Sequence, residues 1–218
     1  MTIILPSLFG ADLLNLKQEI DFLEKEGTEI IHIDLMDGNF VSHIAFGAEQ
    51  IKTIKNYTNM KVDVHMMTAN PDKHLDSILD TGAEMISIHY ESTPHVHLLL
   101  EKIKSNNRKA GIVLNPSTSE EVLKYLLNYI DYVLIMSKNP GEPGVKFIPE
   151  TMHKIKNTHH MIQGQNISIE IDGGVDAKTA KESVKNGADL VVVGGSLFNG
   201  DKKENYQNLL KQIKGQNS

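Results

Sequence analysis

The sequence predicts an α/β fold, a (β/α)8 TIM barrel, on two observations. Short apolar runs alternate with amphipathic segments along the 218 residues. A similar tripeptide, glycine followed by a small and an acidic residue, recurs at three of the junctions: Gly27-Thr28-Glu29, Gly82-Ala83-Glu84 and Gly187-Ala188-Asp189. Glycine just past a helix end relieves left-handed backbone strain, and continuous apolar runs are typical of parallel strands covered on both faces. These junctions therefore indicate helices that end where buried strands begin.

Eight apolar runs are predicted strands, and each leaves room for a helix before the next. They cover residues 3–5, 30–35, 61–66, 85–89, 109–114, 132–136, 168–172 and 190–194. Apolar residues recur at helical spacing within 13–23 and 96–103, and Asp176 is a predicted helix N-cap. Eight β/α units in about this length are typical of the barrel, whose active site lies at the carboxyl ends of the strands. We expect one domain over 1–218.

The composition argues against several classes of partner. A net charge of −6 and a charged fraction of 23% do not suit a nucleic-acid-binding surface. No apolar run approaches the ~18 residues of a membrane span, and no basic leader-like segment precedes Pro6. We therefore expect no nucleic-acid or membrane partner, a cytoplasmic location and a homo-oligomer. Because the chain has no cysteine, any metal ion must be bound by His, Asp or Glu.

Three predicted strands end in alternating polar residues. The pairs are His32 with Asp34, Asp63 with His65, and Glu170 with Asp172. Alternate residues of a strand share one face, and an unpaired buried charge is very costly, so these groups are predicted to surround a cation or a reacting substrate. The candidate metal ligands are His32, Asp34, His65 and Asp172, a nitrogen and oxygen set that suits Zn, Fe, Mn or Co. His89, near another strand end, is expected to bond locally.

Two glycine pairs follow the last two predicted strands, Gly173-Gly174 and Gly194-Gly195. These loops most often form the phosphate site of such barrels, and glycine lets backbone amides approach an anion closely. Either pair alone could be plain turn glycines. Both pairs together favour a phosphorylated small molecule.

Six short motifs extend over nearly the whole chain. They are Pro6-Ser7, His32-Ile33-Asp34-Leu35-Met36-Asp37-Gly38, Asp63-Val64-His65-Met66-Met67, Gly111-Ile112-Val113-Leu114-Asn115-Pro116, Met136-Ser137 with Asn139-Pro140-Gly141, and Glu170-Ile171-Asp172-Gly173-Gly174-Val175. In type and order they resemble the ribulose-phosphate 3-epimerase family. The resemblance implies a barrel of the ribulose-phosphate-binding type and an isomerase that interconverts D-ribulose 5-phosphate and D-xylulose 5-phosphate. It also implies one divalent metal ion on His32, Asp34, His65 and Asp172.

The resemblance assigns roles as well. Asp34 and Asp172 would be the acid and base, because inversion removes a proton from one face and returns one to the other. A Lewis-acidic metal would stabilise the enediolate left by proton removal. Substrate contacts are implied for Ser7, Met36, His65, Met67, Met136, Gly141, Gly144, Gly173, Gly174, Gly194 and Gly195, the methionines as a non-protic wall.

One loop departs from the family pattern, which commonly reads Phe-Gly-Gly-Gln where this chain reads Glu142-Pro143-Gly144-Val145. Proline donates no N–H, and Glu142 would repel a phosphate if it pointed inward, although Lys138 and Lys146 flank the loop and would compensate. Two alternatives stay open: an epimerase of a related ketose phosphate such as D-allulose 6-phosphate, and a non-catalytic sugar-phosphate-binding barrel. Similar barrels that decarboxylate or condense such substrates use Asp-x-Lys-x-x-Asp, and no lysine lies within 34–37.

Overall fold

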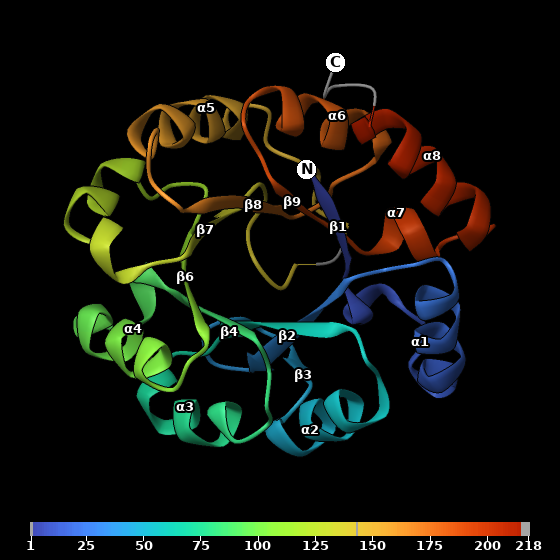
Figure 1. The fold of residues 1–218 in the computed structure, drawn as a ribbon, viewed down its shortest axis with the longest axis horizontal. Coiled ribbons are helices and arrows are strands. Elements are labelled where there is room, and N and C mark those ends of the chain that lie inside the picture. Colours follow the sequence, from blue (N-terminus) through green and yellow to red (C-terminus); the bar gives the residue numbers. More distant parts are fainter. Residues whose placement is uncertain (1, 143, 215–218) are drawn as a thin grey trace.

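The computed structural model describes residues 2–142 and 144–214, and Figure 1 views them down the axis of a barrel. Pro143, at the centre of the divergent loop, lies outside the described residues. The parallel strands of the barrel wall are β1 (Ile3–Pro6), β2 (Ile30–Asp37), β4 (Lys61–Met67), β5 (Met85–His89), β6 (Lys109–Leu114), β7 (Tyr132–Met136), β8 (Ser168–Asp172) and β9 (Leu190–Val193).

The strands pair in the order β1-β9-β8-β7-β6-β5-β4-β2, each with its neighbour in parallel. A parallel bridge between Ser7 and His32 joins the end of β1 to β2 and closes the circle. The predicted (β/α)8 barrel is therefore confirmed, and every predicted strand lies within two residues of the observed one at both ends. The sequence did not predict β3 (Ile44–Ala45), which pairs antiparallel with the end of β2 and is too short to show a periodicity.

Helices surround the barrel (Figure 1). They are α1 (Leu16–Lys25), α2 (Ala48–Tyr57), α3 (Pro71–Leu79), α4 (Val96–Ser105), α5 (Thr151–Met161), α6 (Ala177–Lys185), the short α7 (Gly195–Phe198) and α8 (Lys202–Lys214). After β6 the expected α-helix is replaced by two 3-10 segments, Glu120–Tyr125 and Leu127–Tyr129. Leu123, in the first segment, and Leu126, between the two, are both buried and lie three residues apart, which matches the repeat of a 3-10 helix.

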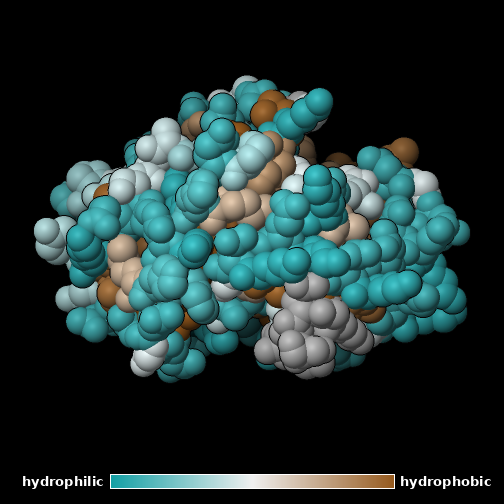
Figure 2. Space-filling model, turned by 90° about the horizontal axis from the view of Figure 1, so that it is seen from above, coloured by the Kyte–Doolittle hydropathy of each residue, from teal (hydrophilic) through white to brown (hydrophobic). Residues whose placement is uncertain are grey.

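The N-cap prediction for α6 is confirmed, since the Asp176 carboxylate accepts a hydrogen bond from the Thr179 amide at 2.8 Å. The outer surface is mostly hydrophilic on the side of α5 and α6 (Figure 2). No helix within 2–142 and 144–214 combines the length and apolarity that a bilayer crossing needs.

The barrel interior changes from apolar to polar along the strands. At the amino ends it is filled by Leu5, Ile30, Met85, Tyr132, Leu190 and Val192. The Tyr132 ring fits because Gly111 has no side chain: a Cβ there would come within 2.3 Å of the ring. Nearer the carboxyl ends, His32, Asp63 and Glu170 are fully buried. Polar groups in such a place need partners, so this layer positions the site described next.

Candidate active site and metal centre

A cavity of about 510 Å³ lies at the carboxyl ends of the strands, where the sequence predicts the site. The predicted residues on its lining are Ser7, Asp34, Met36, Met67, Met136, Gly141, Gly144, Asp172, Gly173, Gly174, Gly194 and Gly195. His32 and His65 are fully buried beside the lining carboxylates Asp34 and Asp172. The structure thus brings together every residue that the sequence assigns to the site.

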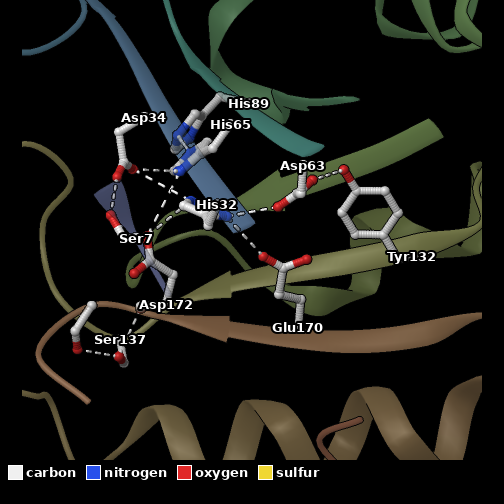
Figure 3. Close-up of polar contacts among 11 residues, drawn as sticks. Ser7, His32, Asp34, Asp63, His65, His89, Tyr132, Ser137, Glu170 and Asp172 are labelled. Carbon is white, nitrogen blue, oxygen red and sulfur yellow. Dashed lines mark hydrogen bonds and ion pairs between the residues drawn. The ribbon is translucent and has the colours of Figure 1, made fainter. Parts of the chain in front are cut away.

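The floor of the cavity consists of His32, Asp34, His65 and Asp172, which converge in Figure 3. Strand alternation points them inward, and the register of β2 and β4 sets Asp34 opposite His65. One ligand atom from each of the four lies within 4.8 Å of the others. The His65 Nδ1 is 3.5 Å from Asp34 Oδ1 and 3.7 Å from Asp172 Oδ2. The His32 Nε2 is 3.4 Å and 4.0 Å from the same two oxygens.

Two orphaned atoms show that this floor fits a metal ion. The His32 Nε2 and the His65 Nδ1 are buried and have no hydrogen-bond partner among residues 2–142 and 144–214. Leaving such atoms unsatisfied costs about 1–3 kcal/mol each. A divalent cation between two imidazole nitrogens and two carboxylates would satisfy both, and this donor set suits Zn, Fe, Mn or Co.

Asp63 holds His32 from behind. The His32 Nδ1 lies 2.6 Å from Asp63 Oδ2, and the Tyr132 hydroxyl donates to Asp63 Oδ1 at 2.8 Å. With the Tyr132 hydroxyl donating to one Asp63 oxygen, the other oxygen is placed to accept from the His32 Nδ1, and the His32 Nε2 then presents a lone pair to the floor. Asp63 and Tyr132 therefore select the metal-binding tautomer of His32.

Glu170 lies on the same side of His32 as Asp63 (Figure 3), with Oε1 3.3 Å from the His32 Nδ1. Both of its oxygens are buried and lack a hydrogen-bond partner within the part of the chain that the structure describes. Burial, together with the charge of Asp63, raises the pKa of Glu170 to about 8. At neutral pH this carboxyl group is mostly protonated, which spares the barrel interior one buried charge.

Asp34 is held ionised by its neighbours. The Ser7 hydroxyl donates to Asp34 Oδ2 at 2.6 Å. Burial alone would raise the pKa of Asp34, but His32 and His65 outweigh it and lower that pKa well below its usual range. Burial would likewise lower the pKa of His32, yet Asp34, Asp63 and Glu170 raise it. The floor therefore favours a positive charge at its centre, either a proton or a metal ion.

His65 has a different support from His32. Its Nε2 lies 2.8 Å from the Nε2 of His89, whose Nδ1 is 3.2 Å from Glu91 Oε2. Burial lowers the pKa of His89 to about 4, so its ring is neutral near pH 7. The expected local bond of His89 is present, to Glu91, but sequence reasoning missed the contact with His65. The signal is in the sequence, because His89 and Glu91 alternate at a strand end as the three recognised pairs do.

One side of the cavity is formed by residues 138–142 and 144–146, which we call the loop wall. The Lys138 Nζ donates to the Glu142 carbonyl at 2.7 Å, and Lys138 and Lys146 both line the cavity. The Glu142 carboxylate does not: its Oε1 lies 3.4 Å from Ser42 Oγ, beside a separate surface hollow. The charge that the loop wall presents to the cavity is therefore positive, and the expected repulsion by an inward Glu142 does not arise.

The loop wall packs directly on the glycines after β8. Gly173 has a φ of +111°, and a Cβ there would approach Lys138 Cγ to 2.7 Å. Glycine is needed at this position on both counts. A Cβ on Gly174 would lie 3.5 Å from the carbonyl oxygen of Val145, in the loop wall, and 3.2 Å from the amide nitrogen of Phe147, which follows the wall. The glycine loop and the loop wall thus form one continuous rim of the cavity.

Comparison with known proteins identifies the family. The model of the ribulose-phosphate 3 epimerase family matches residues 3–198. The chain belongs to this family. The ribulose-phosphate 3-epimerase of Bacillus subtilis is 38% identical over 88% of this chain and 90% of its own, and that of Aquifex aeolicus is 38% identical over 98% and 97%. The expectation of an isomerase of this family is confirmed.

Solved structures agree on the fold. The 3-keto-L-gulonate-6-phosphate decarboxylase of Vibrio cholerae is similar with a TM-score of 0.72, covering 98% of each chain at 13% identity. The orotidine 5'-phosphate decarboxylase of Pyrococcus horikoshii is similar with a TM-score of 0.70 at 16% identity, covering 98% of this chain and 100% of its own. At such identities the likeness shows the barrel fold alone.

Proposed function

We propose that the protein inverts carbon 3 of a phosphorylated ketose, interconverting D-ribulose 5-phosphate and D-xylulose 5-phosphate. One observation carries the proposal: Asp34 and Asp172, from strands that are not neighbours in the barrel, both reach the same imidazole, His65, at the floor of one cavity. Two carboxyl groups on different sides of a bound substrate are what a two-face proton transfer needs.

The proposed chemistry uses the two carboxyl groups in turn. The ionised one removes the proton from carbon 3, and the protonated one delivers a proton to the opposite face; in the reverse reaction they exchange roles. A divalent ion (Zn, Fe, Mn or Co) held by His32, Asp34, His65 and Asp172 would supply Lewis-acid stabilisation of the negative charge that develops on the substrate. The Ser7 hydroxyl, which donates to Asp34, keeps that carboxylate in place.

The rest of the cavity would bind the substrate. Backbone amides at 173–174 and 194–195 would hold the phosphate, and Lys138 and Lys146 add positive charge on the same rim. Met36, Met67 and Met136 would cover the reacting carbon with polarizable side chains that neither donate nor accept protons readily. Gly141 and Gly144 would contribute backbone of the loop wall. The homo-oligomeric state and the cytoplasmic location stay predictions.

A deuterium-exchange experiment tests the proposal. Metal-stripped protein is reloaded with Mn, Fe, Co or Zn, incubated in D2O with D-ribulose 5-phosphate, and deuterium at carbon 3 is followed by NMR. We expect exchange and formation of the xylulose isomer with at least one metal, and neither in the stripped sample.

D-Allulose 6-phosphate is the second substrate in the same experiment, because the loop wall departs from the family pattern. If deuterium exchange occurs with D-allulose 6-phosphate and not with D-ribulose 5-phosphate, the proposed substrate is wrong and the proposed reaction stands. Binding of both sugar phosphates without any exchange would overturn the proposal in favour of a sugar-phosphate-binding barrel.

A further inference from the structure

The support of His65 is a continuous chain of hydrogen bonds that leads out of the barrel. It runs from the His65 Nε2 to the His89 Nε2 at 2.8 Å, and from the His89 Nδ1 to Glu91 Oε2 at 3.2 Å. His65 and His89 are fully buried, whereas the Glu91 side chain is 25% exposed. Figure 3 shows the rings of His65 and His89 close together, and they stack with centroids 4.9 Å apart.

The outer end of the chain is fixed by the loop after β6. Glu91 accepts hydrogen bonds from the Asn115 amide at 2.9 Å and from the Thr118 hydroxyl. Lys154, on α5, donates to the carbonyls of Asn115 and Pro116 at 2.8 Å and 2.9 Å and so ties that loop down. The Glu91 carboxylate is therefore held in place and ionised, and several partners together with His89 lower its pKa to about 2 despite partial burial.

Hydrogen counting along this chain gives one consistent arrangement. Glu91 can only accept, so the His89 Nδ1 carries a hydrogen. One hydrogen lies between the two facing Nε2 atoms, and since the His89 Nδ1 already donates to Glu91, the arrangement that leaves one hydrogen on each ring takes it from the His65 Nε2. A neutral His65 with hydrogen on Nε2 has a lone pair on Nδ1, the unpartnered atom that faces Asp34 and Asp172.

We propose that His89 and Glu91 are positioning residues that fix the ring orientation and the Nδ1 lone pair of His65 for the metal ion. The inference rests on the proposed metal centre. The two histidine ligands then differ in their support. His32 is oriented by a buried carboxylate, whereas His65 is oriented by a buried imidazole that a partly exposed carboxylate holds. Outer partners of metal-bound histidines typically account for about 10–100-fold in metal affinity.

Histidine-ring NMR of the metal-free protein, recorded at alkaline pH where the imidazole rings are neutral, tests the tautomers directly. Long-range 1H–15N spectra distinguish a hydrogen on Nδ1 from one on Nε2. We expect Nε2–H at His65 and Nδ1–H at His89, and a mixture of tautomers at His89 in Glu91→Ala. The proposal is overturned if His65 carries its hydrogen on Nδ1, or if the Glu91→Ala spectrum is unchanged.

Metal affinity supplies the second test, with Co²⁺ alone as the probe and a competing chelator. His89→Leu leaves the His65 Nε2–H without an acceptor and should weaken Co²⁺ binding by about 10–100-fold. His89→Gln keeps an acceptor at a similar reach and should restore most of the affinity. His97→Gln, on the exposed face of α4, is the matched control and should bind Co²⁺ as the unchanged protein does.

His89→Leu changes a buried residue and could prevent folding, so a second variant, Glu91→Ala, is included. The Glu91 side chain lies at the surface, and its removal should leave the fold intact. The Co²⁺ affinity of Glu91→Ala should fall, and Glu91→Gln should restore part of it, because the amide oxygen can still accept from the His89 Nδ1 while the NH2 group cannot accept from the Asn115 amide. Unchanged Co²⁺ affinity in the folded position-89 and position-91 variants would overturn the positioning role alone. Absence of Co²⁺ binding by the unchanged protein would instead overturn the proposed metal centre, and the NMR result would still decide the tautomers.

Discussion

The floor of the cavity is made of strand residues, whereas the loop wall is made of loop residues, and the two are held in different ways. Each floor side chain points inward from a hydrogen-bonded strand, and three of the four contact a further side chain behind them: Ser7 supports Asp34, Asp63 supports His32, and His89 supports His65. The loop wall is largely exposed, and its side-chain hydrogen bonds among the described residues join Lys138 to the Glu142 carbonyl within the wall and Ser42 to the Glu142 carboxylate.

This difference indicates which part can vary. A change at the floor leaves buried charges without partners, which costs several kcal/mol, while a change in an exposed loop usually costs little. The floor retains the residues that the family motifs predict, and the loop wall departs from them. We infer that the reaction is set by the floor and that the choice of phosphorylated ketose is set by the loop wall.

The largest effect is expected at the floor carboxylates. Asp172→Asn or Asp34→Asn should lower the epimerisation rate by more than the ~10²–10⁴-fold typical of a lost acid or base, because a metal ligand is weakened as well. The measurement is the rate of deuterium exchange at carbon 3 in metal-loaded protein. Asp12→Asn is the matched control, because Asp12 is an exposed residue that caps the short 3-10 segment Leu13–Asn15, before α1. A near-normal rate in Asp172→Asn would remove that residue from the acid–base pair.

A second large effect is expected at the floor histidines. His32→Ala and His65→Ala should each lower bound metal and activity together, and by more than the about 10–100-fold that loss of an outer partner costs. Metal content after dialysis, measured by mass spectrometry, gives the first quantity and the exchange rate the second. Full metal occupancy in both variants would place the metal elsewhere.

The sequence predicted the floor better than the supports behind it. Period-two alternation and the burial of the strands are local properties, so His32, Asp34, His65 and Asp172 could be recognised from three short motifs. The partner of His65 could not, because the bond to His89 joins neighbouring strands 24 residues apart in the sequence. The same holds for the loop wall: Glu142 turns outward toward Ser42, 100 residues away, and no local pattern contains that contact.

Two charged residues of the loop wall, Lys138 and Glu142, test its role in substrate binding, because one lines the cavity and the other does not. Lys138→Met removes a positive charge from the cavity and the bond to the Glu142 carbonyl. We expect the KM for the ketose phosphate to rise by about tenfold, equivalent to about 1.4 kcal/mol, with a smaller change in kcat. Glu142→Gln should leave KM almost unchanged, because that carboxylate lies outside the cavity. Steady-state kinetics at low salt measure both.

The opposite result would be informative. If Glu142→Gln lowers KM while Lys138→Met does not raise it, the acidic side chain turns inward when substrate binds. The expected repulsion between Glu142 and the substrate phosphate would then occur in the bound state. The loop wall would weaken substrate binding and would not determine which ketose phosphate is preferred.

The smallest effect is expected outside both regions, at the N-cap of α6. The Asp176 carboxylate accepts from the Thr179 amide at 2.8 Å. Partial burial opposes ionisation, but this hydrogen bond outweighs it and lowers the pKa of Asp176. Asp176→Ala should lower the free energy of unfolding by about 1 kcal/mol at pH 7, measured by urea denaturation of metal-free protein.

The pH dependence of that loss follows from the sign of the pKa change. A group whose pKa is lower in the folded state stabilises the protein above its unfolded pKa, here about 4, and loses that contribution as the pH falls through the folded value. The difference between Asp176→Ala and the unchanged protein should therefore shrink in acid. Asparagine is a cap of similar strength without a charge. Asp176→Asn should therefore be more stable than Asp176→Ala by the same free energy of unfolding at pH 7 and in acid. A gap between the unchanged protein and Asp176→Ala that stays constant into acid would mean that the cap acts through its geometry and not through its charge.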